Sequence, residues 1–460
     1  MKSIRLLALA TALFCTSFSN AQKYVGGDIS LLTKYETNGA KYYDLDGNAI
    51  TDMLGFFKQQ NLNSLRLRLF VDPSKATRAE KGQGVCQDLD YVKALGKRIK
   101  EAGFSLILDF HYSDTWADPG KQWTPDAWTN LTDEQLYTKI YDYTKECLEE
   151  MKKAGAEPDF IQTGNEISYG MLWGKAVITK DTYNESTGNG ETVYDDNVAS
   201  HKKCYSNSPA SNWTRFYQLL KKAGEACKEV CPNAKIILHT ERVATTDYLT
   251  SYYQKMKDNG VNFDIMGLSY YPYFHGGLDQ LEKSLSQLEK DHSDKNIMIV
   301  ETNYYYVWQP AKKIKKEDKG IDYDFSSTWP ITPAGQQAFT KALIEKLNSH
   351  SKVIGLYWWM MEACENGLDW GTKRVTDGWC NTSLFNDSNT SDTGYPAGKV
   401  MPAISELKNF LAGGTGISSL DADKADDPFW YSLDGRRMNS KPQAKGIYLN
   451  NGKKIIINEK

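Results

Sequence analysis

Two glutamates stand where acid–base chemistry needs carboxyl groups. Glu166 follows Asn165 at the end of the run FIQTGNEI (160–167), and Glu301 lies in the run NIMIVETNYY (296–305). Cleavage of a glycosidic bond needs one carboxylic acid to protonate the leaving oxygen and one carboxylate to attack the sugar or activate water. The pair therefore suits glycoside cleavage, and Asn165 suits a hydrogen bond to a sugar 2-hydroxyl.

The surroundings of each carboxyl group decide which one keeps its proton. A cation such as Arg66 near Glu301 favours the ionised form, whereas burial of Glu166 favours the protonated form. Trp and Tyr side chains on the same face supply flat apolar platforms for sugar rings, with polar edges for their hydroxyls.

Other residues of functional type stand near the ends of neighbouring predicted strands. Taken singly, each has a structural explanation, such as a buried ion pair, a core histidine or a packed aromatic ring. Their coincidence on one face favours a shared concave site. They are Arg66, Arg68, Asp109, His111, His239, Glu241, Tyr270, Tyr271, Asn303, Trp358 and Trp359.

Short apolar, β-rich runs alternate with amphipathic segments, which predicts a parallel sheet. Eight such units over nearly 400 residues predict an α/β fold, a closed (β/α)8 TIM barrel. The predicted strands are 24–32, 64–70, 105–112, 160–167, 235–242, 265–272, 296–305 and 353–363; the clearest predicted helices lie within 90–103, 132–155, 213–230 and 333–350.

The connections divide into two kinds. Segments ending in KEAG, KKAG and KDNG precede predicted strands, and their glycines suit left-handed helix caps. The long polar loops 113–131, 168–212, 303–332 and 364–400 instead follow strand C-termini, the face on which a barrel carries its site. The longest insertion, 175–212, has no clear period, and the sequence leaves open a lid, a ligand wall or a metal-held loop.

The chain ends predict export and a small appendage. Residues 1–21 have the charged start, apolar run and small-residue end of a signal peptide, so we expect a periplasmic, cell-surface or secreted protein. Phe14 before Cys15 does not suit lipid anchoring. The catalytic barrel is expected over 22–411, a linker over 412–428 and a β-rich module over 429–460, with turns at Asp434-Gly435 and Asn451-Gly452.

The composition limits the classes of binding partner that we expect. A net charge of -3 and a pI of about 6.2 give no reason to expect nucleic acid, and a mean hydropathy of -0.56 argues against a membrane-embedded body. Eight cysteines, one of them in the predicted leader, leave an odd number in the mature chain, and no Cys or His spacing suits structural zinc. We expect a monomer with no required cofactor.

The motifs together resemble glycoside hydrolase family 53, the endo-β-1,4-galactanases acting on type I arabinogalactan. The resemblance rests on GGDIS, RLRLF, LDFHYSDTWADPGKQWTPDAW, QTGNEI, LSYYPYFHG and IVETNY, and it runs from about Tyr24 to Leu411. The tail resembles C-terminal β modules of exported Bacteroidetes proteins, some of which are sorting signals, although it could equally be a stability module.

The family resemblance implies a retaining mechanism with Glu166 as acid/base and Glu301 as nucleophile, the carboxyls ~5–5.5 Å apart. It implies substrate-binding roles for Arg66, His111, Asp114, Trp116, Asn165, His239, Tyr270 and Trp359. Some relatives hold Ca²⁺ near the strand-seven loop, where Asp322 and Asp324 lie, but the hard oxygen ligands are too few to predict a metal site.

Two alternatives remain open from the sequence. The first keeps the mechanism and changes the substrate to another β-1,4-linked polysaccharide, because related barrels share the two glutamates. The second is a glycan-binding protein without catalysis, which the presence of both carboxyl groups disfavours.

Overall fold

The computed structural model describes residues 22–184, 189–307, 323–364, 380–386, 396–412 and, in the tail, 430–432, 437–438, 442, 446–450 and 453–457. The chain divides into two compact units, Met1–Leu411 and Ala412–Lys460, so the division falls where the predicted linker begins. The predicted signal peptide and nearly all of that linker lie outside the described residues.

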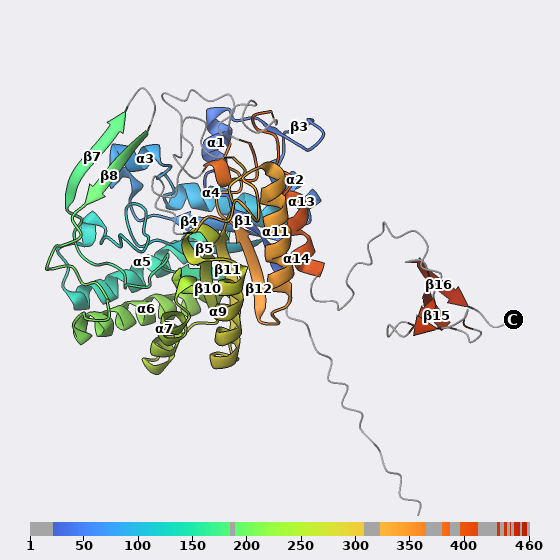
Figure 1. The fold of residues 1–460 in the computed structure, drawn as a ribbon. Helices are drawn as coiled ribbons and strands as arrows, with labels where there is room; N and C mark the ends of the chain where they lie inside the picture. Colours follow the sequence, from blue (N-terminus) through green and yellow to red (C-terminus); the bar gives the residue numbers. More distant parts are fainter. Residues whose placement is uncertain are drawn as a thin grey trace, which may run out of the picture. The chain divides into compact units, whose positions relative to one another are not determined.

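The first unit is a TIM barrel, as predicted (Figure 1). Its strands are all parallel and close in the order β1-β12-β11-β10-β9-β6-β5-β4. They are β1 (Tyr24–Asp28), β4 (Ser64–Leu69), β5 (Ser105–Phe110), β6 (Phe160–Thr163), β9 (Lys235–Thr240), β10 (Ile265–Tyr270), β11 (Asn296–Thr302) and β12 (Val353–Trp358).

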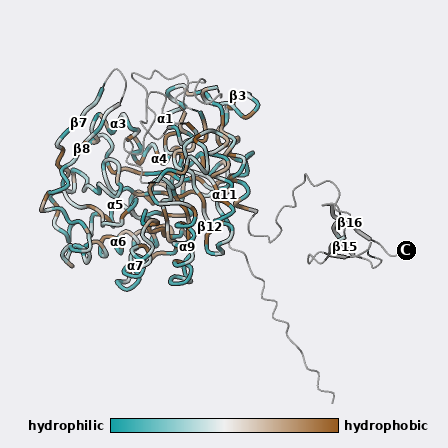
Figure 2. The backbone as a smooth tube through the Cα atoms, viewed as in Figure 1, coloured by the Kyte–Doolittle hydropathy of each residue, from teal (hydrophilic) through white to brown (hydrophobic). Residues whose placement is uncertain are grey.

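Helices surround the barrel, and their apolar positions face inward. On α5 (Asp133–Lys153), buried Leu136, Ile140 and Leu148 recur at helical spacing. The other helices are α1 (Leu32–Asn38), α2 (Met53–Gln59), α3 (Arg78–Gly82), α4 (Leu89–Glu101), α6 (Ala210–Val230), α7 (Thr246–Asp258), α8 (Pro272–His275), α9 (Leu278–Asp291), α11 (Pro333–Asn348), α13 (Ile404–Leu407) and α14 (Asn409–Ala412). In Figure 2 hydrophobic segments gather toward the middle of this unit and hydrophilic ones follow its outer helices and loops.

The glycine caps form as predicted. Gly103, Gly155 and Gly260 follow α4, α5 and α7 with φ of 76°, 80° and 68°. Other residues avoid this left-handed region, so glycine there ends each helix without strain and turns the chain toward the next strand.

The barrel interior changes from apolar to polar along the strands. Side chains two positions apart share a face, so Asp109, Gln162 and His239 point the same way as the apolar residues two positions before them. The polar set is therefore stacked toward the C-terminal ends. Below it lies the apolar cluster of Ile107, Phe160, Ile237, Ile265, Met298, Val300, Ile354 and Tyr357.

Most predicted strands are too long at their C-terminal ends. Strand β6 stops at Thr163 instead of residue 167, and β12 stops at Trp358 instead of 363. Glu166 and Met360 then take φ of 48° and 49°, which a strand does not allow. The mispredicted residues are loop residues that build the mouth of the barrel.

The 175–212 insertion contains a hairpin that the sequence pattern did not predict, β7 (Ile178–Asn184) and β8 (Asn189–Tyr194) (Figure 1). It packs on α3, with Thr77 and Thr192 hydroxyls 2.6 Å apart. The Gln83 side-chain amide donates to the Gly190 carbonyl at 3.1 Å. The hairpin thus forms a wall beside the loop after β4.

Smaller elements complete the description. A two-stranded sheet pairs β2 (Tyr42–Tyr43) with β3 (Ala49–Ile50). The second unit is an antiparallel sheet in the order β14-β13-β15-β16, made of β13 (Trp430–Ser432), β14 (Arg437–Met438), β15 (Gly446–Asn450) and β16 (Lys453–Ile457).

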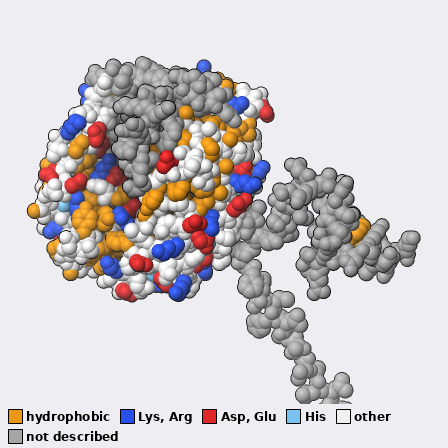
Figure 3. Space-filling model, in the orientation of Figure 1, with side chains coloured by type: hydrophobic (Ala, Val, Ile, Leu, Met, Phe, Trp, Pro, Cys, Tyr) orange, Lys and Arg blue, Asp and Glu red, His pale blue; other side chains and the backbone are white. Residues whose placement is uncertain are grey.

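The described cysteines form no disulfide with one another; Cys86, Cys147, Cys204, Cys227 and Cys231 are free thiols. Within the described residues no helix is long and apolar enough to cross a membrane. Figure 3 shows basic and acidic side chains interspersed on the visible face of the barrel unit.

Candidate active site

Arg66 lies at the centre of the polar layer. On β4 it stands between two strands that each carry a carboxylate, and its Cα pairs with Asp28 of β1. Its guanidinium contacts Asp28 at 3.1 Å and Asp109 at 2.7 Å. It also contacts Glu301 at 2.9 Å and donates to the Asn165 side-chain oxygen at 2.9 Å. One buried cation therefore connects the two predicted catalytic segments.

Glu166 is presented by a tight turn after β6. Gly164 takes φ 111° and Glu166 φ 48°, and the Glu166 N–H donates to His239 Nδ1 at 3.3 Å. From the loop after β5 the Gln122 side-chain amide donates to the Asn165 carbonyl at 2.7 Å. These bonds hold the backbone in a strained conformation, which directs the carboxyl group into the mouth of the barrel.

Glu301, near the end of β11, is held by neighbours on β10 and β4. The Tyr271 hydroxyl donates to Oε2 at 2.8 Å, and Ser269 Oγ lies 3.4 Å from the same oxygen. Oε1 faces Arg66. Each oxygen therefore has a fixed partner, so the carboxylate has a defined orientation.

The pKa values separate the two carboxyl groups. Burial, and then the charges of Glu301 and Glu241, raise the pKa of Glu166 well above 4.5. Burial also raises the pKa of Glu301, to about 7, although Arg66 and Tyr271 act to lower it. The sequence prediction that Arg66 keeps Glu301 ionised thus holds for the direction of the Arg66 effect, but burial outweighs it. Of the two glutamates, Arg66 contacts only Glu301, so the proton of this pair belongs on Glu166.

Two histidines support the site from below its surface. His111 Nδ1 accepts from the Ala117 N–H at 3.1 Å, and its Nε2 lies 3.1 Å from Asp109. His239 Nε2 lies 2.8 Å from Ser269 Oγ. Burial lowers the pKa of both histidines, so the neutral rings position neighbouring groups.

The cleft above these residues has a volume of about 280 Å³. It contains both glutamates, two tryptophans and Asn165, so five of the predicted site residues meet there. Arg66, His111 and His239 lie buried beneath it. The lining residues are Gln83, Trp116, Ala117, Asp118, Lys121, Asn165, Glu166, Tyr271, Glu301, Trp359 and Met360.

Two further predicted substrate-binding residues, Tyr270 and Asp114, do not line the cleft either. Tyr270 belongs to the core outside the barrel, and its hydroxyl donates to the Gly276 carbonyl at 3.0 Å. Tyr271, one residue later, occupies the cleft because β10 ends at Tyr270 and the chain turns there. Asp114 accepts from the backbone N–H groups of Asp72 and Asp126 at 3.1 and 2.7 Å, so it ties two loops together.

Sequence reasoning also missed Gln83, Asp118, Lys121 and Met360 in the lining. Asp118 and Lys121 stood in the quoted motif ADPGKQ, but no signal distinguished them from loop residues. Gln83 directly follows α3 and contacts the β7–β8 hairpin. Because the sequence did not predict this hairpin, it gave no sign that Gln83 lines the cleft.

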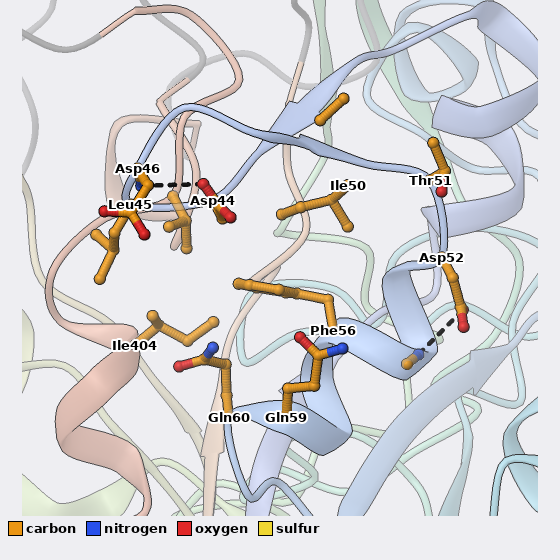
Figure 4. Close-up of a pocket in the computed structure, with 13 residues that line it drawn as sticks. Asp44, Leu45, Asp46, Ile50, Thr51, Asp52, Phe56, Gln59, Gln60 and Ile404 are labelled. Carbon is orange, nitrogen blue, oxygen red and sulfur yellow. Dashed lines mark hydrogen bonds between the residues drawn. The ribbon is translucent and has the colours of Figure 1, made fainter.

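A larger cavity, of about 380 Å³, lies elsewhere, between the β2–β3 hairpin, α2 and α13 (Figure 4). Two of its carboxylates already accept backbone bonds: Asp44 from Asp46 at 2.9 Å and Asp52 from Gly55 at 3.0 Å. It contains none of the predicted site residues.

The described residues give no added support for a calcium site near Asp322 and Asp324. Asp324 accepts from the Ser326 N–H at 2.8 Å, and Asp322 lies outside the described residues. No cluster of three or more His, Cys, Asp or Glu side chains there could hold a metal ion.

Comparison with known proteins decides the family. The model described as Glycosyl hydrolase family 53 matches residues 24–397. The chain belongs to this family. It is therefore a glycoside hydrolase, and the family resemblance inferred from its motifs is confirmed.

Two relatives of this family 53 protein are named as galactanases. Arabinogalactan endo-β-1,4-galactanase A of Aspergillus niger is 30% identical over 349 residues, which cover 74% of this chain and 85% of that protein. The endo-β-1,4-galactanase of Bacillus subtilis (strain 168) is 28% identical over 339 residues, covering 73% and 68%.

Solved structures agree in fold. The Ignisphaera aggregans GH53 catalytic domain has a TM-score of 0.67 at 28% identity, covering 85% of this chain and 96% of that one. A structure of fungal β-1,4-galactanases has a TM-score of 0.63 at 25% identity, covering 84% and 99%.

Exchanging the two adjacent tyrosines for phenylalanine tests the site geometry. Tyr271→Phe removes a hydrogen bond to Glu301 and should lower kcat on a soluble glycan by about 10- to 100-fold, the equivalent of one bond to a charged group. Tyr270→Phe removes a bond outside the barrel and should leave kcat within about twofold. Equal losses in the two variants, or a loss in Tyr270→Phe alone, would contradict the assignment.

The raised pKa of Glu166 predicts a pH-dependent stability. As the pH rises above about 4.5, the unfolded chain releases this proton while the folded protein keeps it, so this group's contribution to stability falls. The substitution Glu166→Gln removes the titrating group and therefore that fall. Its melting temperature relative to the unsubstituted protein should rise from pH 4.5 to 7; a constant or falling difference would show that the folded-state pKa is not raised.

Proposed function

We propose that this family 53 protein is a retaining endo-β-1,4-galactanase that acts on type I arabinogalactan. The asymmetric pair carries the proposal: Glu166 and Glu301 line one cleft, and of these two glutamates Arg66 contacts only Glu301. The galactanase names of the relatives support the choice of substrate.

The chemistry follows from where the proton lies. Glu166 donates its proton to the glycosidic oxygen while the Glu301 carboxylate attacks the anomeric carbon, so the C–O bond breaks and a glycosyl ester forms on Glu301. Deprotonated Glu166 then takes a proton from water, whose oxygen attacks the same carbon and releases Glu301. Two displacements retain the anomeric configuration.

The cleft offers separate groups for binding and for charge. Trp116 and Trp359 provide aromatic surface for sugar rings. Asn165 uses its side-chain N–H to reach the Ala117 carbonyl at 2.8 Å and lines the cleft, where its second N–H suits the sugar 2-hydroxyl. Arg66 and Tyr271 hold Glu301 for attack.

Export and a monomeric state also belong to the proposal. They are motivated by the leader-like residues 1–21 and by the absence of any expected partner other than a polysaccharide.

Glutamine substitutions test the function on purified β-1,4-galactan, with reducing-end release and product sizing as the measurement. Glu166→Gln should lower kcat by about 10²–10⁴-fold, since it removes the general acid. Glu301→Gln removes the attacking carboxylate and should lower kcat further. On an aryl galactoside with an acidic leaving group, Glu166→Gln should keep the first displacement, because that step no longer needs a proton.

Glu362→Gln is the matched control. Glu362 is also buried, follows β12 and accepts from the Leu31 N–H at 2.8 Å, a bond that glutamine can keep. It should leave kcat within about threefold. Cleavage of mannan, cellulose or xylan in place of galactan would contradict the proposed substrate. Binding of galactan without the release of new reducing ends would contradict the proposed catalytic function.

A further inference from the structure

Arg68 is a buried cation with few partners. It is fully buried, and Nη1 contacts Asp28 at 2.9 Å. Its Nε and Nη2 have no hydrogen-bond partner among the described residues. Arg66, two residues earlier, uses both of its terminal nitrogens on oxygen atoms. A guanidinium removed from water normally needs such bonds, so another interaction must stabilise Arg68.

Two indoles occupy the space around this guanidinium. Its central carbon lies 4.5 Å from the Trp116 ring centroid and 5.2 Å from that of Trp359, within the range of cation–π attraction. The two rings lie 6.1 Å apart at an angle of 65°. Both indoles line the cleft, whereas Arg68 does not.

The two tryptophans come from separate parts of the chain. Trp116 belongs to the loop after β5, and Trp359 follows β12 directly. Within the described part of the chain no hydrogen bond uses either indole N–H, so side-chain hydrogen bonds do not fix their angle. The guanidinium is a rigid plane that both rings contact, and Asp28 anchors it from β1.

We propose that Arg68 is a positioning residue that sets the angle between Trp116 and Trp359 and so determines how tightly the cleft binds a sugar ring. It does not touch the substrate. This inference rests on the proposed function only for the choice of galactan as the ligand.

Kinetics of two variants test the proposal. Arg68→Met has similar length but neither charge nor a planar group, and it should raise KM for galactan by about tenfold with kcat within about threefold of the unsubstituted enzyme. Arg68→Lys keeps the pair with Asp28 but loses the planar contact, so its KM should be intermediate. The pH profile of kcat should not move in either variant.

Arg98→Met is the matched control. Arg98 pairs with Glu36 on the surface at 2.8 Å, and its loss should leave KM unchanged. A fall in kcat at unchanged KM, or a shifted pH profile, in the Arg68 variants would mean that Arg68 acts on the carboxyl groups, which overturns the proposal.

Near-ultraviolet circular dichroism without ligand gives a second, independent readout. The tryptophan bands should weaken in Arg68→Met and keep their intensity in Arg98→Met; unchanged bands in the Arg68 variants would overturn the proposal. If Arg68→Met does not fold, Arg68→Lys decides by the same criteria. Failure of the unsubstituted protein to cleave galactan would overturn the proposed function, whereas the tryptophan bands would still test Arg68.

Discussion

The ion pairs of Arg66 are the constraint on which the site depends. Its guanidinium contacts Asp28, Asp109 and Glu301, all of them buried. Removing these charges from water is unfavourable by several kcal/mol per ion unless they are paired, so the cluster forms only where the geometry brings every partner into place. Burial and the charge of Glu301 favour a proton on Glu166, the carboxyl group of the pair that Arg66 does not contact.

The barrel supplies that geometry in two ways, through the pairing of adjacent strands and through the closure of the sheet. Asp28 and Asp109 lie on the two strands that flank β4. The register pairs Asp28 with Arg66 itself and Asp109 with Arg68, two residues further along the same face. Glu301 belongs to β11, on the other side of β12 and β1, and reaches Arg66 only because the sheet closes. Closure of the barrel therefore brings Glu301 to Arg66, and the turn after β6 brings Glu166 to the same cleft. Both carboxyl groups meet at the C-terminal mouth of the barrel for this reason.

The sequence predicted the repeating parts of the structure well. All eight strands and the glycine caps were found, because period, composition and turn residues are local signals. The strand ends were not, since Glu166 and Met360 adopt left-handed conformations held by contacts from other strands. Tyr270 was chosen over Tyr271 for the same reason: the change of face depends on where β10 ends. The hairpin of β7 and β8 was missed because β7 is mostly exposed and shows no apolar alternation.

Trapping the intermediate tests the account most directly. A 2-deoxy-2-fluoro galactoside with an activated leaving group slows release of the sugar from the attacking carboxylate, so that peptide mass spectrometry can locate the bound sugar. The account predicts one fluorogalactosyl group on the peptide that contains Glu301, and none on the peptide that contains Glu166. A sugar on Glu166, or hydrolysis of galactan with inversion and no trapped adduct, would contradict the assignment of the nucleophile to the carboxylate beside Arg66.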